Sequence, residues 1–247
     1  MVDRTQLEPT SAFSQPCEYF DENWHIYHKV LQNNYMEHRE IYSVLHEFLV
    51  HRVQKPFQLL DLGCGDAGNT VSALIGTSIQ SYYGIDLSQV AIALALNNLA
   101  AIPCPKTLIE GDFTALVPQL LNTQQKCFDI ILASFSLHHL KLKQKDNLMD
   151  QLFQLLNSDG VLLLIDLVRQ EAEERNTYID RYSKTMYQDW TALTPQEVAS
   201  LETHMTSSDF PETQKTLQEL ALKHGFSRSE CLYQDSLERW QLLCFHK

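Results

Sequence analysis

The spacing of apolar residues changes repeatedly along the chain, and these changes predict its secondary structure. Short, nearly continuous apolar runs have the length of buried strands. They lie at 57–62, 81–85, 107–110, 128–133 and 161–167. Between them, apolar residues recur at the three- and four-residue spacing of an amphipathic helix. Strands that alternate with helices form parallel sheets, so the pattern predicts an α/β fold with a doubly wound sheet.

Helical patterns also occur before, within and after this alternation. Residues 17–53 have the pattern of two helices with a break near 32–34. A helix at 146–156 is followed by Asn, Ser, Asp and Gly at 157–160, which predicts the end of the helix and a turn. A last helix is predicted at 211–224.

The first predicted strand runs into a glycine-rich turn, which is the most informative stretch of the sequence. Residues 57–70 read FQLLDLGCGDAGNT. Gly63, Gly65 and Gly68 allow sharp backbone turns and let a ligand approach the main chain closely. A strand that passes through such a turn into a helix N-terminus predicts a binding site for a nucleotide-like cofactor.

Two classes of cofactor use such a turn, and the charges around it distinguish them. The glycine spacing fits a dinucleotide fingerprint, in which an acid such as Asp86 follows about 20 residues on. Asp61 and Asp66, however, put two negative charges beside the place where phosphates would bind. No Lys or Arg occurs between Lys55 and Lys106 to offset them. The acidic turn therefore favours a cofactor that carries positive charge.

The motif DLGCG at the turn, together with YYGIDLS at 82–88, resembles the motifs of the class I S-adenosylmethionine-dependent methyltransferases. Their cofactor has a sulfonium and an ammonium group and no phosphate. The resemblance implies a Rossmann-like, seven-stranded sheet of order 3-2-1-4-5-7-6 that ends in an antiparallel hairpin, here 229–234 and 239–245. The usual GxGxG form has its third glycine at the position of Ala67.

The resemblance also implies which residues contact the cofactor. Asp86 would accept hydrogen bonds from both ribose hydroxyls, because carboxylate oxygens are acceptors only. In a competing interpretation, Asp86 only favours the N-terminus of a helix capped by Ser88. Asp112 would accept from the adenine amino group, cap the next helix, or do both. The predicted cofactor contacts are Asp61, Gly63, Cys64, Gly65, Asp86, Leu87, Asp112, Phe113, Ser134, Phe135, Tyr35 and Arg39.

Two of these residues come from the N-terminal segment, where members of the family often place a Tyr or Arg against the methionine carboxylate. Tyr35 and Arg39 are four positions apart, so they would share one face of a helix.

Cys64 belongs to the predicted cofactor contacts because it lies inside the glycine turn. We interpret it as a small packed side chain rather than a redox switch.

The fourth predicted strand runs into SFSLHHL at 134–140, a run that the family carries where the cofactor methyl group meets the substrate. His138 and His139 are therefore the candidate catalytic residues, because a neutral imidazole can take a proton near pH 7. The competing interpretation is structural, with one histidine packed on the following turn. The occurrence of LHHL in members with unlike substrates favours it.

The segment 170–208 resembles an insertion that covers the substrate in several relatives. Thr194, Pro195 and Glu197 give the signal of a capped helix start. A cluster of Tyr and Trp residues in this segment either closes over a ligand or packs the lid. We predict one domain, 1–247, in four parts: an N-terminal helical cover (17–56), a cofactor-binding core (57–168), a helical lid insertion (169–208), and the last helix with the hairpin (209–247).

These motifs predict an enzyme that uses S-adenosylmethionine to methylate a small molecule. Since the cofactor supplies the chemistry and the protein positions the acceptor, the sequence does not identify the acceptor. A second hypothesis is an enzyme resembling carboxy-S-adenosylmethionine synthase, in which Arg169, Arg175 or Arg181 could bind the extra carboxylate. A non-catalytic cofactor-binding module and an NAD oxidoreductase also use such a turn, and the acids around it weigh against the latter.

Composition and charge limit the kinds of molecule that we expect the protein to bind. The chain has 247 residues and a net charge of −12, which disfavours nucleic acid. No apolar run approaches the ~20 residues that span a bilayer, and the N-terminus is too polar for a signal peptide, so we expect a cytoplasmic protein without a membrane partner. None of the six cysteines forms a CxxC pair, so we expect no metal. We expect a monomer or homodimer.

Overall fold

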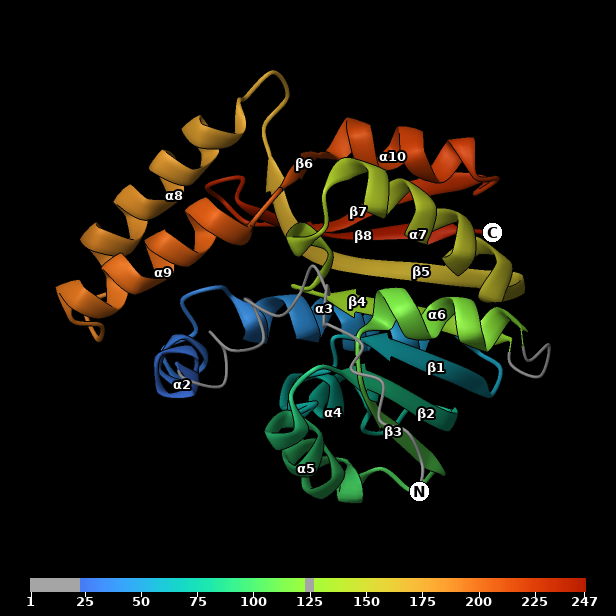
Figure 1. The fold of residues 1–247 in the computed structure, drawn as a ribbon. Coiled ribbons are helices and arrows are strands. Elements are labelled where there is room, and N and C mark those ends of the chain that lie inside the picture. The colour runs from blue at the N-terminus through green and yellow to red at the C-terminus, as the bar shows by residue number, and fades with distance from the viewer. Residues whose placement is uncertain (1–22, 123–126) are drawn as a thin grey trace, which may run out of the picture.

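The computed structural model describes residues 23–122 and 127–247, so the predicted start of the helical cover at 17 lies outside the described residues. Its core is a sheet of order β3-β2-β1-β4-β5-β8-β7, in which β8 alone runs antiparallel to its neighbours (Figure 1). A two-residue strand, β6, pairs with β5 beside this path. The predicted order is therefore confirmed, because β6 only raises the numbers of the last two strands by one.

The predicted strands lie within the observed ones, except that 239–245 begins one residue before β8. Their bounds are β1 (Phe57–Leu62), β2 (Ile79–Asp86), β3 (Lys106–Glu110), β4 (Phe128–Ser134), β5 (Leu156–Arg169), β6 (Glu212–Thr213), β7 (Arg228–Gln234) and β8 (Trp240–His246). Along β1, Phe57 and Leu59 face one core of buried side chains, and Leu60 and Leu62 face the other. Both faces are apolar because helices cover a parallel sheet on both sides.

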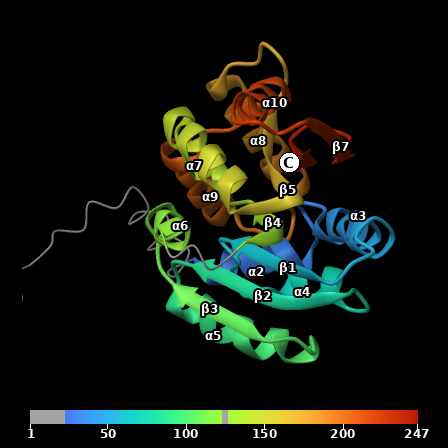
Figure 2. The ribbon, with the colours of Figure 1, turned by 90° about the vertical axis from the view of Figure 1, so that its right-hand side faces the viewer.

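Helices form a layer on each face of the sheet (Figure 2). One layer contains α3 (His38–His51), α4 (Gly68–Leu74), α5 (Gln89–Asn98) and the short η1 (Leu99–Ala101). The other contains α6 (Phe113–Asn122), α7 (Leu142–Leu155) and α10 (Gln214–Lys223). The predicted break in the N-terminal segment is confirmed, since α2 (Trp24–Gln32) ends there and α3 begins after it.

Several predicted boundaries are wrong. The helix predicted at 146–156 begins four residues earlier, at Leu142. Residues 157–160 do not form a separate turn, because β5 already begins at Leu156, which pairs with Phe128. The next pair is Val161 with Ile130, so 157–160 bulge out of the strand. The Lys247 ammonium donates to the carbonyls of Phe153 (2.7 Å) and Leu156 (2.8 Å), which satisfies the end of α7 without a glycine stop.

The last helix likewise begins later than predicted. Glu212 and Thr213 pair with β5 as the strand β6, and α10 starts only at Gln214. The Thr213 side chain caps it by accepting from the Thr216 amide (3.1 Å). Glu212 and Thr213, which the periodicity assigned to the first turn of the helix, therefore pair with β5 as a strand instead.

The segment after β5 forms two helices that stand apart from the sheet, α8 (Arg175–Asp189) and α9 (Pro195–Ser208) (Figure 1). The predicted capping box is confirmed, with Thr194 and Glu197 bonded reciprocally. The Lys29 ammonium reaches Glu197 (2.7 Å), and the Tyr35 ring stacks on Trp190 with centroids 5.0 Å apart. These contacts join the N-terminal helices to α8 and α9 as one cover.

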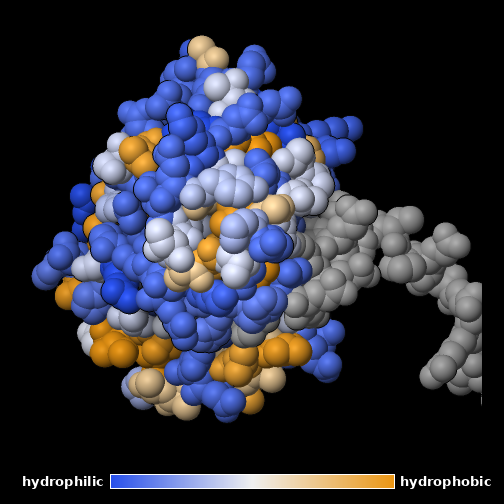
Figure 3. Space-filling model, turned by 90° about the vertical axis from the view of Figure 1, so that its left-hand side faces the viewer, coloured by the Kyte–Doolittle hydropathy of each residue, from blue (hydrophilic) through white to orange (hydrophobic). Residues whose placement is uncertain are grey.

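The outer surface of this cover is mostly polar. Figure 3 shows hydrophilic residues over most of the face that carries α2, α8 and α9. Apolar residues of α8, such as Tyr178, Tyr182 and Met186, are buried on the inner side. In the part of the chain that the structure describes, no helix combines the length and the apolar character needed to cross a bilayer.

Candidate active site

Two connected cavities lie at the carboxyl ends of β1 and β4, where the strand order reverses direction. This is where open α/β sheets bind ligands. The larger encloses about 1320 Å³, including its mouth to solvent, and the smaller about 400 Å³. Both are lined by the same six residues, so they are adjoining parts of one site: Tyr27, His38, Gly63, Gly65, Ser134 and Phe135.

The glycine turn forms the floor between the cavities. Gly63 has φ +70°, and a Cβ there would lie 2.7 Å from Ser136 Cβ, so no other residue fits. Gly65 has φ +52° with no atom within 4 Å of its missing Cβ, which leaves open space for a ligand. Ala67 adopts φ +54° where the family form has glycine, at a cost of ~1–2 kcal/mol. The backbone at position 67 is therefore left-handed even though the residue is not glycine. Gly68 is the first residue of α4.

Asp86 is held by the backbone at the end of β2. Its Oδ2 accepts from the Gly65 amide (2.8 Å) and its Oδ1 from the Ser88 amide (2.9 Å). Ser88 caps α5 by accepting from the Ala91 amide (3.2 Å), so the cap is the serine. Asp86 and Leu87 line the larger cavity. Since a carboxylate has about four acceptor positions, Asp86 can still accept from a ligand.

Asp61 lies beneath the turn and lines the smaller cavity. It accepts from the hydroxyls of Tyr82 (2.7 Å) and Thr70 (3.1 Å). Burial raises the pKa of Asp61 to about 7, although these two hydrogen bonds oppose the rise. Burial also raises the pKa of the Cys64 thiol well above its usual range, which agrees with a packed side chain and not with a reactive thiolate.

The two residues predicted to contact adenine, Asp112 and Phe113, have different positions relative to the cavities. Phe113 lines the larger cavity, whereas Asp112 lines neither. Asp112 Oδ1 accepts from the Thr114 amide (2.7 Å) and hydroxyl (2.6 Å), so it caps α6. The capping role that the sequence left open is therefore present, and the adenine contact stays a prediction.

Ser134 and Phe135 lie at the end of β4, on the wall that both cavities share. The Tyr42 hydroxyl donates to Ser134 Oγ (2.8 Å). Phe135 has φ +47°, and its ring lies 5.1 Å from the ring of His38. A non-glycine residue in this conformation is strained, and such strain is frequent at ligand sites.

Tyr35 and Arg39 do not share a helical face, and that prediction is wrong. Tyr35 lies in the turn before α3, where its hydroxyl accepts from the Ala192 amide (2.7 Å). Arg39 is exposed and donates to the Gln32 carbonyl (3.1 Å). Neither side chain lines a cavity. The break of the helix at 33–37 is the reason, because it removes the regular spacing between the two residues.

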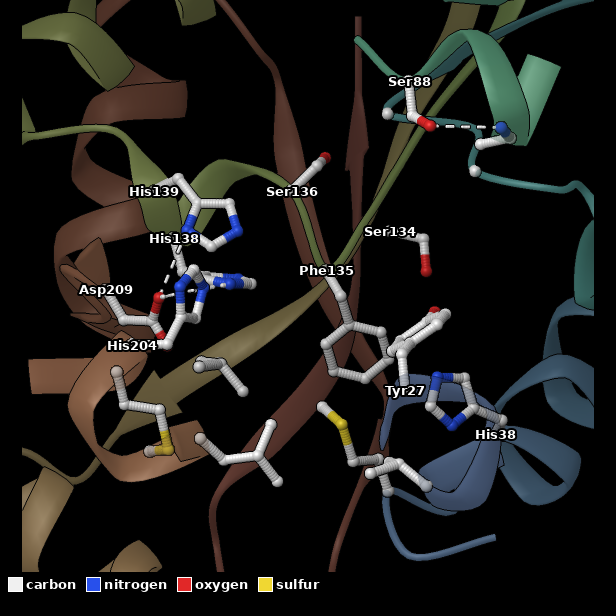
Figure 4. Close-up of a pocket in the computed structure, with 18 of the residues that line it drawn as sticks. Tyr27, His38, Ser88, Ser134, Phe135, Ser136, His138, His139, His204 and Asp209 are labelled. Atoms are coloured by element: carbon white, nitrogen blue, oxygen red, sulfur yellow. Dashed lines mark hydrogen bonds and ion pairs between the residues drawn. The ribbon is translucent and has the colours of Figure 1, made fainter. Parts of the chain in front are cut away.

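The two candidate catalytic histidines belong to a larger polar cluster at the far end of the larger cavity (Figure 4). His138 and His139 lie in η2 (Leu137–His139), His204 projects from α9, and Asp209 follows α9. Asp209 Oδ1 lies 3.2 Å from His139 Nδ1, 3.7 Å from His204 Nε2 and 3.8 Å from His138 Nε2. His138 Nδ1 contacts Asp166 Oδ1 at 2.5 Å.

Burial and charge act against each other in this cluster. Burial lowers the pKa of His138, but the carboxylates of Asp166 and Asp209 outweigh it and the net pKa is raised. Burial lowers the pKa of His204 to about 4, with Asp209 opposing only in part. Burial would raise the pKa of Asp209, yet His138 and His139 hold it below its usual value. The imidazoles around the Asp209 carboxylate therefore differ in pKa, which is raised for His138 and lowered for His204.

Sequence reasoning missed several residues of the site. His38 lines both cavities, and burial lowers its pKa to about 4, so its imidazole is neutral. Among the described residues, none forms a hydrogen bond with His38 Nδ1. Tyr27, His204 and Asp209 also line the larger cavity. Tyr27 and His38 lie in the predicted N-terminal helical cover, where no motif marks them, and no local pattern in the sequence links Asp209 to η2.

The three arginines considered for an extra carboxylate line neither cavity. Arg175 donates to the carbonyl of Asp209 (2.6 Å), and Arg181 pairs with Glu173 (2.8 Å). Arg169 donates to the carbonyls of Pro211 (3.1 Å) and Glu173. No Lys or Arg appears among the described residues that line the cavities.

Comparison with known proteins agrees with this architecture. A family model described as a methyltransferase domain matches residues 24–228. An uncharacterized methyltransferase of Bacillus cytotoxicus is 31% identical over 160 residues, which is 63% of this chain and 70% of the relative.

Among solved structures, magnesium protoporphyrin IX methyltransferase from Synechocystis PCC 6803 with bound S-adenosylhomocysteine has a TM-score of 0.65 at 12% identity, covering 96% of this chain and all of that one. A putative O-methyltransferase from Nostoc punctiforme has a TM-score of 0.55 at 15% identity, covering 82% of this chain but only 55% of that one. At these identities the two structures establish a shared fold.

Proposed function

The chain belongs to the methyltransferase domain family, as a class I S-adenosylmethionine-dependent enzyme, and on that premise we propose that it methylates a small-molecule acceptor held beneath α8 and α9. The observation that carries this proposal is the histidine cluster, which gives one polar end to a cavity with otherwise mainly apolar walls. Such a cavity suits an apolar molecule with one nucleophilic group.

The residues around the turn fit the cofactor. Gly65 leaves open space above the main chain, and Asp86 is fixed in place by two backbone amides. Asp61 and Asp66 line the smaller cavity and supply negative charge for a cationic ligand. His38 offers a buried nitrogen, without a partner among the described residues, at the wall between the cavities. These residues would hold S-adenosylmethionine, which supplies an activated methyl group when bound.

The acceptor chamber is supported by residues from the cover. The larger cavity is lined by Met186 of α8, by Trp190 directly after α8, and by Leu201 and Met205 of α9, together with Leu167. They would exclude water and hold the acceptor, and positioning of two reactants can contribute ~7–11 kcal/mol to a rate enhancement. On this basis we propose that residues 169–208 act as the lid.

The nucleophilic group of the acceptor would point toward His138 and His139. Both histidines line the larger cavity, as does Phe135, which lies between the cluster and His38 in Figure 4. We assign the two histidines to the binding and activation of that group. Substrates whose methylated atom carries no proton would need them only for positioning.

Two competing functions find less support. An enzyme that makes a carboxylated cofactor needs a cation for the extra carboxylate, and all three candidate arginines are engaged outside the cavities. A non-catalytic module would be favoured by a lid that fills the site with its own aromatic rings. Tyr182 and Trp190 line the cavity without filling it.

A turnover screen tests the proposal. The protein would be incubated with methyl-labelled S-adenosylmethionine and separate pools of phenols, carboxylic acids, amines, total tRNA and protein. We expect label in a small-molecule pool, and none there with the Asp86→Ala variant. Transfer to tRNA or protein alone, or to no pool despite cofactor binding, would contradict the proposed acceptor class.

A further inference from the structure

The histidine cluster has the spacing of a metal site. Three imidazole nitrogens lie 3.2, 3.7 and 3.8 Å from a single oxygen, Asp209 Oδ1. Ligand atoms bound tetrahedrally to Zn²⁺ at ~2.0–2.2 Å are separated by roughly 3.3–3.6 Å. One nitrogen each from His138 and His139 and one oxygen of Asp209 also lie within 4.8 Å of one another. A cation placed among these three would need little movement of the side chains.

Asp166 orients the first of these ligands. The contact between His138 Nδ1 and Asp166 Oδ1 (2.5 Å) assigns the proton to Nδ1, which leaves the lone pair of Nε2 facing Asp209. Asp166 is itself fixed by the Leu167 amide, which donates to the same oxygen (2.8 Å). A carboxylate behind a histidine in this manner is the usual outer shell of a metal-bound imidazole.

Asp209 Oδ1 is surrounded by imidazoles, yet its geometry to them is poor for hydrogen bonding. Asp209 is 3% exposed, and among the described residues no donor forms a well-directed hydrogen bond with Oδ1. Its backbone is held firmly, because Arg175 donates to the Asp209 carbonyl (2.6 Å) and the Phe210 amide donates to the His138 carbonyl (2.6 Å). The buried oxygen is therefore held by three long, poorly directed contacts, and a cation bound between the imidazoles and Oδ1 would replace them with direct coordination.

We propose that His138, His139 and Asp209 bind one divalent transition-metal ion, for which Zn²⁺ is the best fit, with a coordination position open to the larger cavity. Two histidines and one carboxylate are a ligand set of catalytic zinc sites, which keep one position for water or substrate. The expectation of no metal rested on the absence of paired cysteines and did not consider histidine ligands.

The metal site stands on its own geometry, whereas its role rests on the proposed function. A metal ion at this end of the cavity would bind the nucleophilic oxygen or nitrogen of the acceptor as a Lewis acid. That would hold the acceptor toward the glycine turn and favour loss of its proton. The two histidines would then act as metal ligands rather than as free bases.

Metal binding can be measured without turnover. Metal-free protein would be titrated with Co²⁺, whose visible absorption reports tetrahedral coordination, and with Zn²⁺ in competition with a chromophoric chelator. We expect one ion per chain. Asp209→Asn and His139→Gln should each weaken binding by more than ~100-fold, and Asp166→Asn by ~10–100-fold, because it changes only the outer shell.

A second group of possible ligands provides the matched control. Glu230, Cys244 and His246 of the β7–β8 hairpin also have atoms within 4.8 Å of one another. A double variant, Glu230→Gln with His246→Gln, should keep the Co²⁺ spectrum and the affinity of the wild type. Thermal unfolding and S-adenosylhomocysteine affinity would establish that each variant is folded.

The outcomes separate this inference from the proposed function. Failure of the wild type to bind Zn²⁺ or Co²⁺, or unchanged binding by Asp209→Asn and His139→Gln, would overturn the metal site. Loss of binding only in the hairpin variant would move the site elsewhere and equally overturn it. A metal-free protein that still methylates a small molecule would leave the proposed function standing, and a metal-binding protein without any turnover would not.

Discussion

The two ends of the cavity are built in different ways. The glycine-turn end is held by the sheet, since the Gly65 amide donates to the Asp86 carboxylate and the Gly63 and Cys64 amides donate to the Ile85 carbonyl of the neighbouring strand. The histidine end combines η2 with α9 and Asp209, which come from distant parts of the chain and are joined by side chains. The first end can recognise a cofactor with little adjustment. The second depends on an insertion that can change while the sheet stays the same, which is where differences in acceptor specificity would arise.

The largest effect is expected from the floor of the first end. Gly63→Ala should lower the free energy of unfolding by ~2–4 kcal/mol, because it adds a strained left-handed residue to a steric overlap with Ser136. Chemical denaturation measures the loss. Gly76→Ala is the matched control, with φ +76° but no atom within 4 Å, and should cost only ~1–2 kcal/mol. Equal losses would show that the contact with Ser136 is unimportant.

Asp86→Ala should act on binding at the same end. It removes charge-assisted hydrogen bonds, so the affinity for S-adenosylhomocysteine should fall by ~1.5–3 kcal/mol in a calorimetric titration. Asp112→Ala sharpens the comparison, because Asp112 caps α6 and lines neither cavity. It should cost ~0.5–2 kcal/mol of stability with little change in affinity. A large loss of affinity in Asp112→Ala would establish an adenine contact.

Asp61 should make stability depend on pH. Burial raises its pKa to about 7 in the folded state, against about 4 in an unfolded chain. The unfolded chain therefore loses this proton first, and the fold becomes less stable as pH rises from about 4 to about 7. Asp61→Asn should remove this loss and raise the unfolding free energy by ~1–3 kcal/mol at pH 8, with no gain below pH 4.

Denaturation at several pH values would test this expectation. The same substitution should weaken cofactor binding, because it removes a negative charge from the smaller cavity. A variant with the pH profile of the wild type would mean that the Asp61 carboxyl titrates normally in the fold.

The smallest effect is expected where the cover meets the N-terminal helices. Tyr35→Phe keeps the stacking on Trp190 but loses the hydrogen bond from the Ala192 amide, for ~0.5–1.5 kcal/mol. If the cover closes the acceptor chamber, KM for the acceptor should rise more than the Kd for S-adenosylhomocysteine. An equal change in both constants would argue against a separate acceptor end.

The same contrast explains what the sequence could predict. The strand order, the family and the cofactor are confirmed, because a glycine turn and the acid of the next strand lie within 30 residues and follow from local geometry. Asp86 lies where the motif predicts, although its contact with ribose stays a prediction. The shared helical face predicted for Tyr35 and Arg39 is wrong because the chain leaves the helix between them, and periodicity fixes helix boundaries poorly.

The full histidine cluster could not be predicted from local sequence patterns. His138 and His139 were visible as a motif, but His204 and Asp209 reach them only through the packing of α9 against η2. No pattern in the sequence around Asp209 indicates a partner about 70 residues earlier. Strand pairing at β6 and the bulge in β5 were missed for the same reason, since both depend on contacts between distant segments.

The most direct test of the central claim is a crystal structure of the complex with S-adenosylhomocysteine. We predict the ribose hydroxyls on Asp86, the amino acid portion in the smaller cavity beside Asp61, and the sulfur near Phe135, facing the histidine cluster across the larger cavity. A nucleoside bound elsewhere, or a sulfur turned away from His138, His139 and Asp209, would contradict the account.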